Sequence, residues 1–302
     1  MKSEVRNPKV IRSGQTSHRW HRGILVAAKD WLPVLSCLTL IALLSFVPGC
    51  KPKQRPASPA IATATSYLET AALDVLGEDK RVLRLAEPGT CPGHFDVRPS
   101  QAAEMRCCQA LLRFDFQKSL DTLLDGSGTN HPFVIEVTIH DGLCCPTSYL
   151  SACRQIADAF VAHGLLEKTN ADVRLQSIAA RLDSLTRQST NLVAQAGLVS
   201  RPVIASVHQS DFCAWLGLKV VATFRAADTS SVAEIDDAIS AGKLAEIKLV
   251  IANLPEGRRT ADALAERLEA RVAVFGNFPA IKHGRMSFDD LLNGNVEALV
   301  QP

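Results

Sequence analysis

One segment near the middle of the chain contains no glycine or proline over 27 residues, from Asn170 to Ala196. Its apolar residues recur mostly at helical spacing, with charged and amide side chains between them: Val173, Leu175, Ile178, Leu182, Leu185, Leu192 and Val193. At about 1.5 Å per residue, a helix of this length would span roughly 40 Å, which is long for a globular protein. We therefore predict one rigid helix that connects two halves of the protein. Two shorter helices, with a break near Ser189–Thr190, are the alternative.

The chain on either side of this segment alternates between strand-like and helix-like stretches. The first half predicts strands at Arg81–Leu85 and Phe133–Ile139 and helices at Tyr67–Leu76, Gln101–Leu112 and Tyr149–Gly164. The second half predicts strands at Pro202–Val207, Lys219–Phe224, Ile247–Ala252 and Arg271–Phe275, and helices at Gln209–Leu216, Ser231–Ser240, Arg258–Leu268 and Phe288–Val300. Such spacing is typical of βα units around parallel sheets. The predicted fold class is α/β: two similar α/β lobes, residues 60–169 and 198–302, joined by one long helix over residues 170–197.

The N-terminal 49 residues resemble a bacterial lipoprotein signal peptide. Basic residues dominate positions 1–30, Trp31–Val47 is an uncharged apolar run, and Val47–Cys50 resembles a lipobox in which Cys50 would carry the lipid. Residues 50–59 are polar and rich in proline, which predicts an extended tether. An uncleaved N-terminal anchor is the alternative. Both interpretations place the rest of the chain outside the cytoplasm.

The net charge argues against a nucleic-acid partner. The full chain carries 33 basic and 31 acidic residues, a formal charge of +2. Removing residues 1–49 takes away seven basic and two acidic residues, which leaves 26 and 29, a charge of −3. A protein that binds nucleic acid usually has a basic surplus. The sequence also lacks G-x-S-x-G, H-E-x-x-H and P-loop motifs, so we do not expect an enzyme.

Polar side chains follow several predicted strands, at the edge where parallel sheets bind ligands. His94 lies in the loop after Arg81–Leu85, and His140 ends the strand Phe133–Ile139. In the second half, His208, Glu256 and Asn277 each follow a strand. Imidazole and oxygen ligands that come from separate strand ends suit a divalent transition metal. These five residues are the candidate metal site.

Each candidate also has a simpler interpretation. The ring of His94 could bond to the backbone of its loop, and His140 could be an ordinary residue at a strand end. His208 could cap the helix that follows it. Glu256 could interact with the N-terminal end of the helix Arg258–Leu268, and Asn277 could be a turn residue before Phe-Pro.

Two motifs resemble those of the zinc/manganese ABC-transporter substrate-binding lipoproteins. Cys91–Ser100 (CPGHFDVRPS) resembles the loop with the family's first metal-binding histidine, which an aromatic residue and a Pro-Ser follow. His208, with Asp211–Phe212 and Trp215–Leu218 after it, resembles the C-terminal ligand at the start of a short helix. Asn170–Ala196 resembles the connecting helix of that family.

The resemblance implies that His94 and His208 bind one metal ion, zinc or manganese, from opposite lobes of an inter-lobe cleft. It places a second N-terminal ligand near His140–Pro146, where His140 or one of Cys144 and Cys145 would serve unless this ligand is absent. It places the acidic C-terminal ligand near Asn277, for which Glu256 could compensate. The metal would be a transported ligand. The implied partners are an ABC permease and a bacterial membrane, reached through the lipid on Cys50. We expect a monomer.

Seven cysteines remain outside the signal peptide and the lipidation position: Cys91, Cys107, Cys108, Cys144, Cys145, Cys153 and Cys213. An odd number leaves at least one thiol free or bound to metal, although disulfides are the default outside the cytoplasm. A second hypothesis is therefore an extracytoplasmic redox or metal-stress lipoprotein. A third is a protein of the same family that binds a ligand other than a metal, since an acidic ligand is missing.

Overall fold

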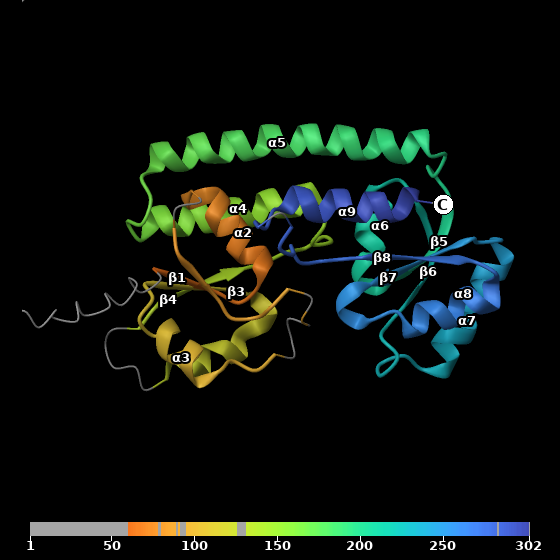
Figure 1. The fold of residues 1–302 in the computed structure, drawn as a ribbon, viewed down its shortest axis with the longest axis horizontal. Coiled ribbons are helices and arrows are strands. Elements are labelled where there is room, and N and C mark those ends of the chain that lie inside the picture. The colour runs from red at the N-terminus through yellow and green to blue at the C-terminus, as the bar shows by residue number, and fades with distance from the viewer. Residues whose placement is uncertain are drawn as a thin grey trace, which may run out of the picture. The chain divides into compact units, whose positions relative to one another are not determined.

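The computed structural model describes residues 60–77, 80–88, 90, 95–125, 131–282 and 284–301. Two four-stranded parallel sheets form in this part of the chain, and both have the same strand order (Figure 1). The first, ordered β2-β1-β3-β4, contains β1 (Ile61–Thr63), β2 (Val82–Arg84), β3 (Ala110–Phe114) and β4 (Phe133–Val137). The second, ordered β6-β5-β7-β8, contains β5 (Pro202–Ser206), β6 (Lys219–Phe224), β7 (Leu249–Asn253) and β8 (Arg271–Phe275). The predicted signal peptide, the tether, Cys50 and His94 lie outside the described residues.

Helices follow the strands in both lobes. The N-terminal lobe has α2 (Ser66–Leu76), α3 (Pro99–Met105), the 3₁₀ segment η1 (Asp115–Leu124) and α4 (Pro146–Ala162). The C-terminal lobe has η2 (Val207–Gln209), α6 (Ser210–Trp215), α7 (Val232–Leu244), η3 (Leu254–Glu256), α8 (Arg259–Leu268) and α9 (Phe288–Val300). The prediction of two similar α/β lobes is confirmed by the matching strand orders.

The long connecting segment is a single helix, α5 (Lys168–Gln195), of 28 residues. It passes through Ser189 and Thr190 without a break, where Ser189 is buried and the Thr190 hydroxyl donates to the carbonyl of Thr186 at 2.9 Å. One face of α5 packs on α2, α4 and α9, which lie beside it in Figure 1. Its other face is exposed and polar, as expected for a surface helix. Of the helices in the described residues, none is both long and apolar enough to cross a bilayer.

The predicted helix Gln101–Leu112 is wrong in its second half. Helix α3 ends at Met105, and Ala110–Phe114 forms strand β3 between β1 and β4. All five residues of β3 are buried, so both faces of the strand are apolar. A short apolar run of this kind lacks the alternation of a half-exposed strand and looks the same as a buried helix.

The last helix of the chain joins the two lobes. Helix α9 follows the C-terminal sheet, yet Phe288 at its start stacks on Tyr149 of the N-terminal lobe, with ring centroids 4.1 Å apart. Tyr67 contacts the Phe288 ring edge-to-face, with ring centroids 6.2 Å apart. These three rings are fully buried in a core that extends from the N-terminal sheet through α5 to β5, β7 and β8. A second core fills the far side of the C-terminal sheet, beneath α7 and α8.

An ion-pair cluster lies beside these rings. Arg181 of α5 donates to Asp74 of α2 at 2.5 Å and lies 3.6 Å from Asp289 of α9. The Tyr149 hydroxyl donates to the same Asp74 carboxylate at 2.7 Å. Burial raises the pKa of Asp289, an effect that Arg181 opposes. The cluster thus joins the linking helix to an element from each lobe.

We expect Phe288→Ala to lower the free energy of unfolding by about 3–5 kcal/mol, because it leaves a cavity between two buried tyrosine rings. Phe116→Ala is the matched control, since Phe116 is 60% exposed, and its expected cost is below about 1 kcal/mol. Urea unfolding of both variants measures the difference. Equal costs would show that the α9 contact does not hold the lobes together.

Candidate metal site

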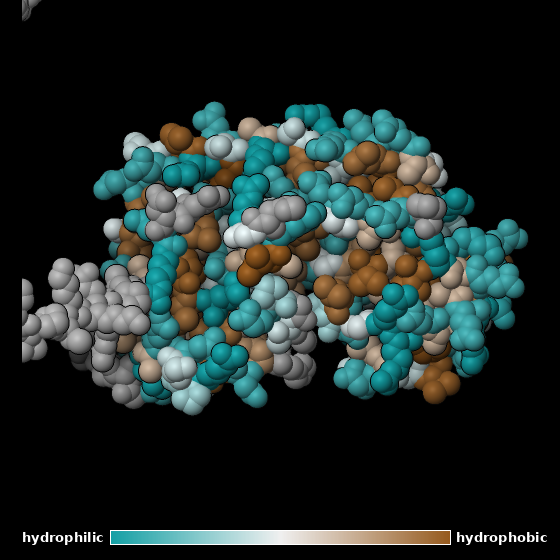
Figure 2. Space-filling model, viewed as in Figure 1, coloured by the Kyte–Doolittle hydropathy of each residue, from teal (hydrophilic) through white to brown (hydrophobic). Residues whose placement is uncertain are grey.

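Two of the predicted ligands lie at the point in the C-terminal sheet where the strand order reverses. From β5 the chain crosses to β6 on one side and later reaches β7 on the other, so the loops after β5 and β7 diverge. Such a switch point at the carboxyl end of a parallel sheet is the usual ligand site of an α/β lobe. His208 lies in η2 after β5, and Glu256 lies in η3 after β7. Figure 2 shows that the surface is hollowed between the two lobes, on the side away from α5.

His208 and Glu256 form a pair. Nε2 of His208 lies 3.3 Å from Oε1 of Glu256. The other carboxylate oxygen accepts a 2.5 Å hydrogen bond from the buried hydroxyl of Ser206, which also accepts from the backbone N–H of His208 at 3.3 Å. The imidazole is 61% exposed and the carboxylate 16% exposed, so one partner is held by the fold and the other faces solvent. An imidazole nitrogen and a carboxylate oxygen this close can share one cation.

Asn277 is placed differently, because its side chain is buried and occupied by another amide. Its Oδ1 accepts from Nε2 of Gln209 at 2.8 Å, and the same Gln209 nitrogen donates to Oδ1 of Asn253 at 3.0 Å. Asn277 follows β8, Gln209 lies in η2 after β5, and Asn253 is the last residue of β7; all three are at most 5% exposed. Gln209 Oε1 is buried and has no hydrogen-bond partner among the described residues. Asn277 can therefore reach a metal only by giving up its bond to Gln209.

This amide cluster continues across the lobe boundary to Cys144. The thiol donates to the carbonyl of Gly276 at 3.0 Å and lies 3.5 Å from Asn277 Oδ1. Asn295 of α9 closes the network: its Nδ2 donates to the Gly276 carbonyl and to the sulfur, and its Oδ1 accepts from the Gly276 N–H. Burial raises the pKa of Cys144, so the thiol stays protonated and neutral. The innermost contact between the lobes is thus polar but carries no charge.

The remaining candidates are less defined. His140 is exposed in the loop between β4 and α4, and His94 lies outside the described residues. Within the described residues, no set of three or more histidine, cysteine, aspartate or glutamate side chains is arranged to hold a metal ion. The structure therefore brings together His208 and Glu256, keeps Asn277 in the amide cluster, and leaves the site assignment a prediction.

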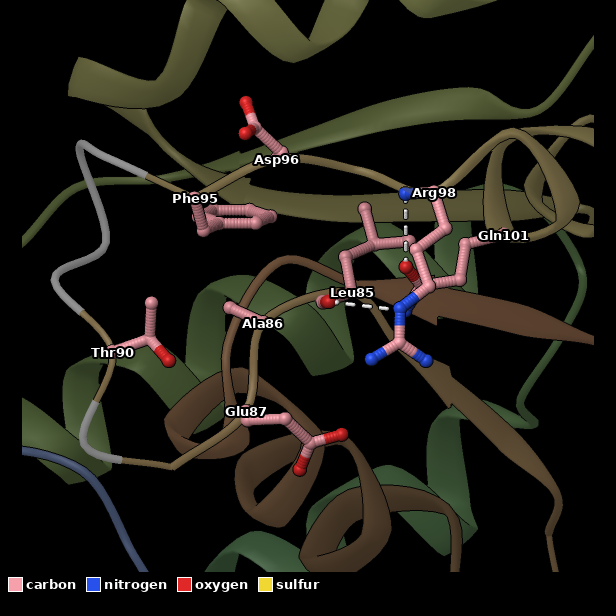
Figure 3. Close-up of a pocket in the computed structure, with 8 residues that line it drawn as sticks. All are labelled: Leu85, Ala86, Glu87, Thr90, Phe95, Asp96, Arg98 and Gln101. Carbon is pink, nitrogen blue, oxygen red and sulfur yellow. Dashed lines mark hydrogen bonds between the residues drawn. The ribbon is translucent and has the colours of Figure 1, made fainter.

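A pocket of about 310 Å³ lies in the N-terminal lobe, between the residues that follow β2 and the start of α3 (Figure 3). Phe95 and Asp96 form one side, and Leu85, Ala86 and Glu87 form the other. Gln101 links the two sides, because its amide accepts from the backbone N–H of Arg98 at 3.1 Å and donates to the carbonyl of Leu85 at 3.1 Å. The loop that follows β2 is thereby tied to the start of α3.

Sequence reasoning missed several residues that shape this region. Gln209 stands next to His208, but only the 3₁₀ turn of η2 shows that Gln209 points inward and His208 outward. Ser206 carried one available signal, since a serine at the end of a buried strand often caps the following turn. Asn295 has no local signal, because its partners Gly276 and Cys144 are distant in the sequence.

Comparisons with known proteins agree with this architecture. Neither the models of protein families nor the curated sequences match the chain. Among solved structures, the manganese-bound periplasmic metal binding protein from Candidatus Liberibacter asiaticus superposes with a TM-score of 0.68 at 13% identity, covering 80% of this chain and 97% of that one. A cadmium-bound structure of that protein gives the same values. A zinc-bound ZnuA deletion mutant superposes at 0.65 and 16% identity, covering 81% of this chain and all of the other.

The chain has the fold of the periplasmic metal-binding proteins. The fold implied by the family resemblance is therefore confirmed. With so few identical residues, the likeness establishes the backbone arrangement and leaves the ligands to be argued from the side chains.

We expect Asn295→Ala to destabilise the protein by about 2–3 kcal/mol, because the partly buried N–H of Gly276 loses its acceptor and the Gly276 carbonyl loses one of its two side-chain donors. Asn293→Ala is the control on the same helix, with an expected effect within about 0.5 kcal/mol. Chemical unfolding compares the two variants. A small effect of Asn295→Ala would mean that water replaces the hydrogen bonds to Gly276, and therefore that water enters the contact between the lobes.

Proposed function

We propose that this protein captures a divalent metal ion, zinc or manganese, outside the cytoplasm and delivers it to an ABC importer. The pairing of His208 with Glu256 at the sheet switch point carries the proposal. It gains support from the fold, which is shared with proteins solved with manganese, cadmium and zinc. In this proposal the protein binds the metal ion and catalyses no reaction.

In this proposal the two lobes contribute ligands of different strength. His208 and Glu256 supply the C-terminal half of the site, and His94 supplies the N-terminal half. His140 is a further ligand from the N-terminal lobe, and Asn277 joins only after it releases Gln209. With Glu256 as the one carboxylate among the five, the site would carry less negative charge than one with an aspartate at position 277. Weaker binding of hard cations follows, which favours zinc over manganese.

The proposal includes the rest of the delivery system. Lipidation of Cys50 would hold the protein at a bacterial membrane, and residues 50–59 would let the lobes reach a permease as a monomer. The continuous core beneath α5 supports small lobe movements during metal transfer rather than a wide hinge opening.

Calorimetric titration of the purified full-length protein with zinc and with manganese tests the site. We expect His208→Ala and Glu256→Gln to weaken zinc binding by about tenfold or more, equivalent to about 1.4 kcal/mol each. Ser206→Ala should weaken it less, since Ser206 positions Glu256 without touching the ion. His94→Ala tests the opposite lobe in the same assay.

His163→Ala is the matched control, because His163 ends α4 and stacks on Phe133, in the N-terminal lobe rather than at the switch point. Its zinc affinity should equal that of the unaltered protein. Unchanged affinity in both His208→Ala and Glu256→Gln would remove these residues from the site. No zinc or manganese binding at all would instead support the second candidate, a non-metal ligand, which the neutral cluster of Gln209, Asn253 and Asn277 favours.

A further inference from the structure

Three buried thiols meet where the two lobes touch. Cys144 and Cys145 precede α4 in the N-terminal lobe, and Cys213 lies on α6 in the C-terminal lobe. Their exposed fractions are 0%, 3% and 0%, and all three are reduced in the structure. Both Cys145 and Cys213 are part of the buried core, and the proposed metal site uses neither.

The two neighbouring cysteines have different surroundings. Cys144 is held by Gly276 and Asn295 in the neutral cluster. Cys145 instead lies near α6, as the neighbours of Gly142 indicate. A Cβ atom on Gly142 would lie 3.6 Å from the sulfur of Cys145 and only 3.2 Å from both Asp211 Cβ and the backbone nitrogen of Phe212.

This close approach brings Cys145 to the turn of α6 that carries Cys213. Phe212 directly precedes Cys213, and its backbone nitrogen and the Cys145 sulfur both lie close to the same Gly142 position. Cys213 is fully buried, as is Phe212 before it, whereas Ala214 after it is exposed. The electrostatic influence of Cys145 on Cys213 agrees with this proximity.

We propose that Cys145 and Cys213 form a reversible disulfide that links the two lobes. The oxidant is another disulfide, such as oxidised glutathione or an extracytoplasmic thiol–disulfide oxidoreductase. The thiolate of one cysteine attacks the oxidant and expels one thiolate, which forms a mixed disulfide. The second cysteine then attacks the protein sulfur and expels the other thiolate. The protein loses two electrons and two protons, and the oxidant is reduced to two thiols.

The buried state of the thiols controls when this exchange occurs. Burial raises the pKa of both thiols to about 12, with further contributions from Asp211 and Asp141 at Cys145 and from Cys145 at Cys213. Because the thiolate is the reacting species, both cysteines are unreactive while the lobes are in contact. Separation of the loop before α4 from α6 exposes them to the oxidant, and the disulfide then holds the lobes together.

Thiol mapping of the full-length protein tests this link directly. The purified protein is incubated with oxidised glutathione in low urea, free thiols are blocked with N-ethylmaleimide, and tryptic peptides are analysed by mass spectrometry without reduction. We expect the peptide that contains Cys213 to be joined to the one that contains Cys144, Cys145 and Cys153. The oxidised protein should have a higher Tm, and dithiothreitol should reverse the shift.

Variants identify the cysteine involved. Cys145→Ser and Cys213→Ser should each abolish the linked peptide, whereas Cys144→Ser and Cys153→Ser should retain it. Fragmentation of the linked peptide from the unaltered protein locates the bond even if a variant does not fold. An unlinked Cys213, a bond to Cys144 or Cys153, or a Cys144–Cys145 bond would overturn the proposal. The outcome is independent of metal binding, because neither thiol is a proposed ligand.

Discussion

The entry of α9 into the N-terminal lobe is the contact on which the rest of the structure depends. Phe288 packs against both Tyr67 and Tyr149, and this contact makes the last helix of the chain part of the first lobe's core. Without this contact, each of the two small sheets would have to bury its apolar faces within its own lobe. With it, most of the buried side chains belong to one core, so separation of the lobes exposes apolar surface and is opposed by the hydrophobic effect.

The same arrangement explains why charge is distributed unevenly around the lobe contact. Asp74, Arg181 and Asp289 form a cluster beside α5, where long side chains can pair and remain partly solvated. The contact at Gln209, Asn277 and Cys144 instead contains neutral groups that hydrogen-bond to one another. Burial of an unpaired charge costs far more than burial of a hydrogen-bonded amide, so a dry interface favours this composition. The His208–Glu256 pair lies where solvent reaches the imidazole.

Close packing at Gly142 connects the metal proposal with the disulfide proposal. A side chain at this position would meet Asp211 and Phe212, so the loop before α4 lies against α6 without space between them. Movement of this loop would alter both the amide cluster and the exposure of Cys145. Metal binding and cysteine oxidation would therefore both depend on how far the lobes are separated, although they use different residues.

The sequence by itself determined the α/β class, the two lobes, the long helix and the location of candidate ligands at strand ends, because periodicity and strand–helix alternation are local properties. It did not determine that Ala110–Leu112 is a strand, since a buried apolar run has no distinguishing period. Only the tertiary structure decided that His208 pairs with Glu256 while Gln209 turns inward to Asn277. It also decided that Cys144, Gly276 and Asn295 meet. These contacts join residues 19 to 151 positions apart, and their geometry depends on how two sheets and α9 pack together.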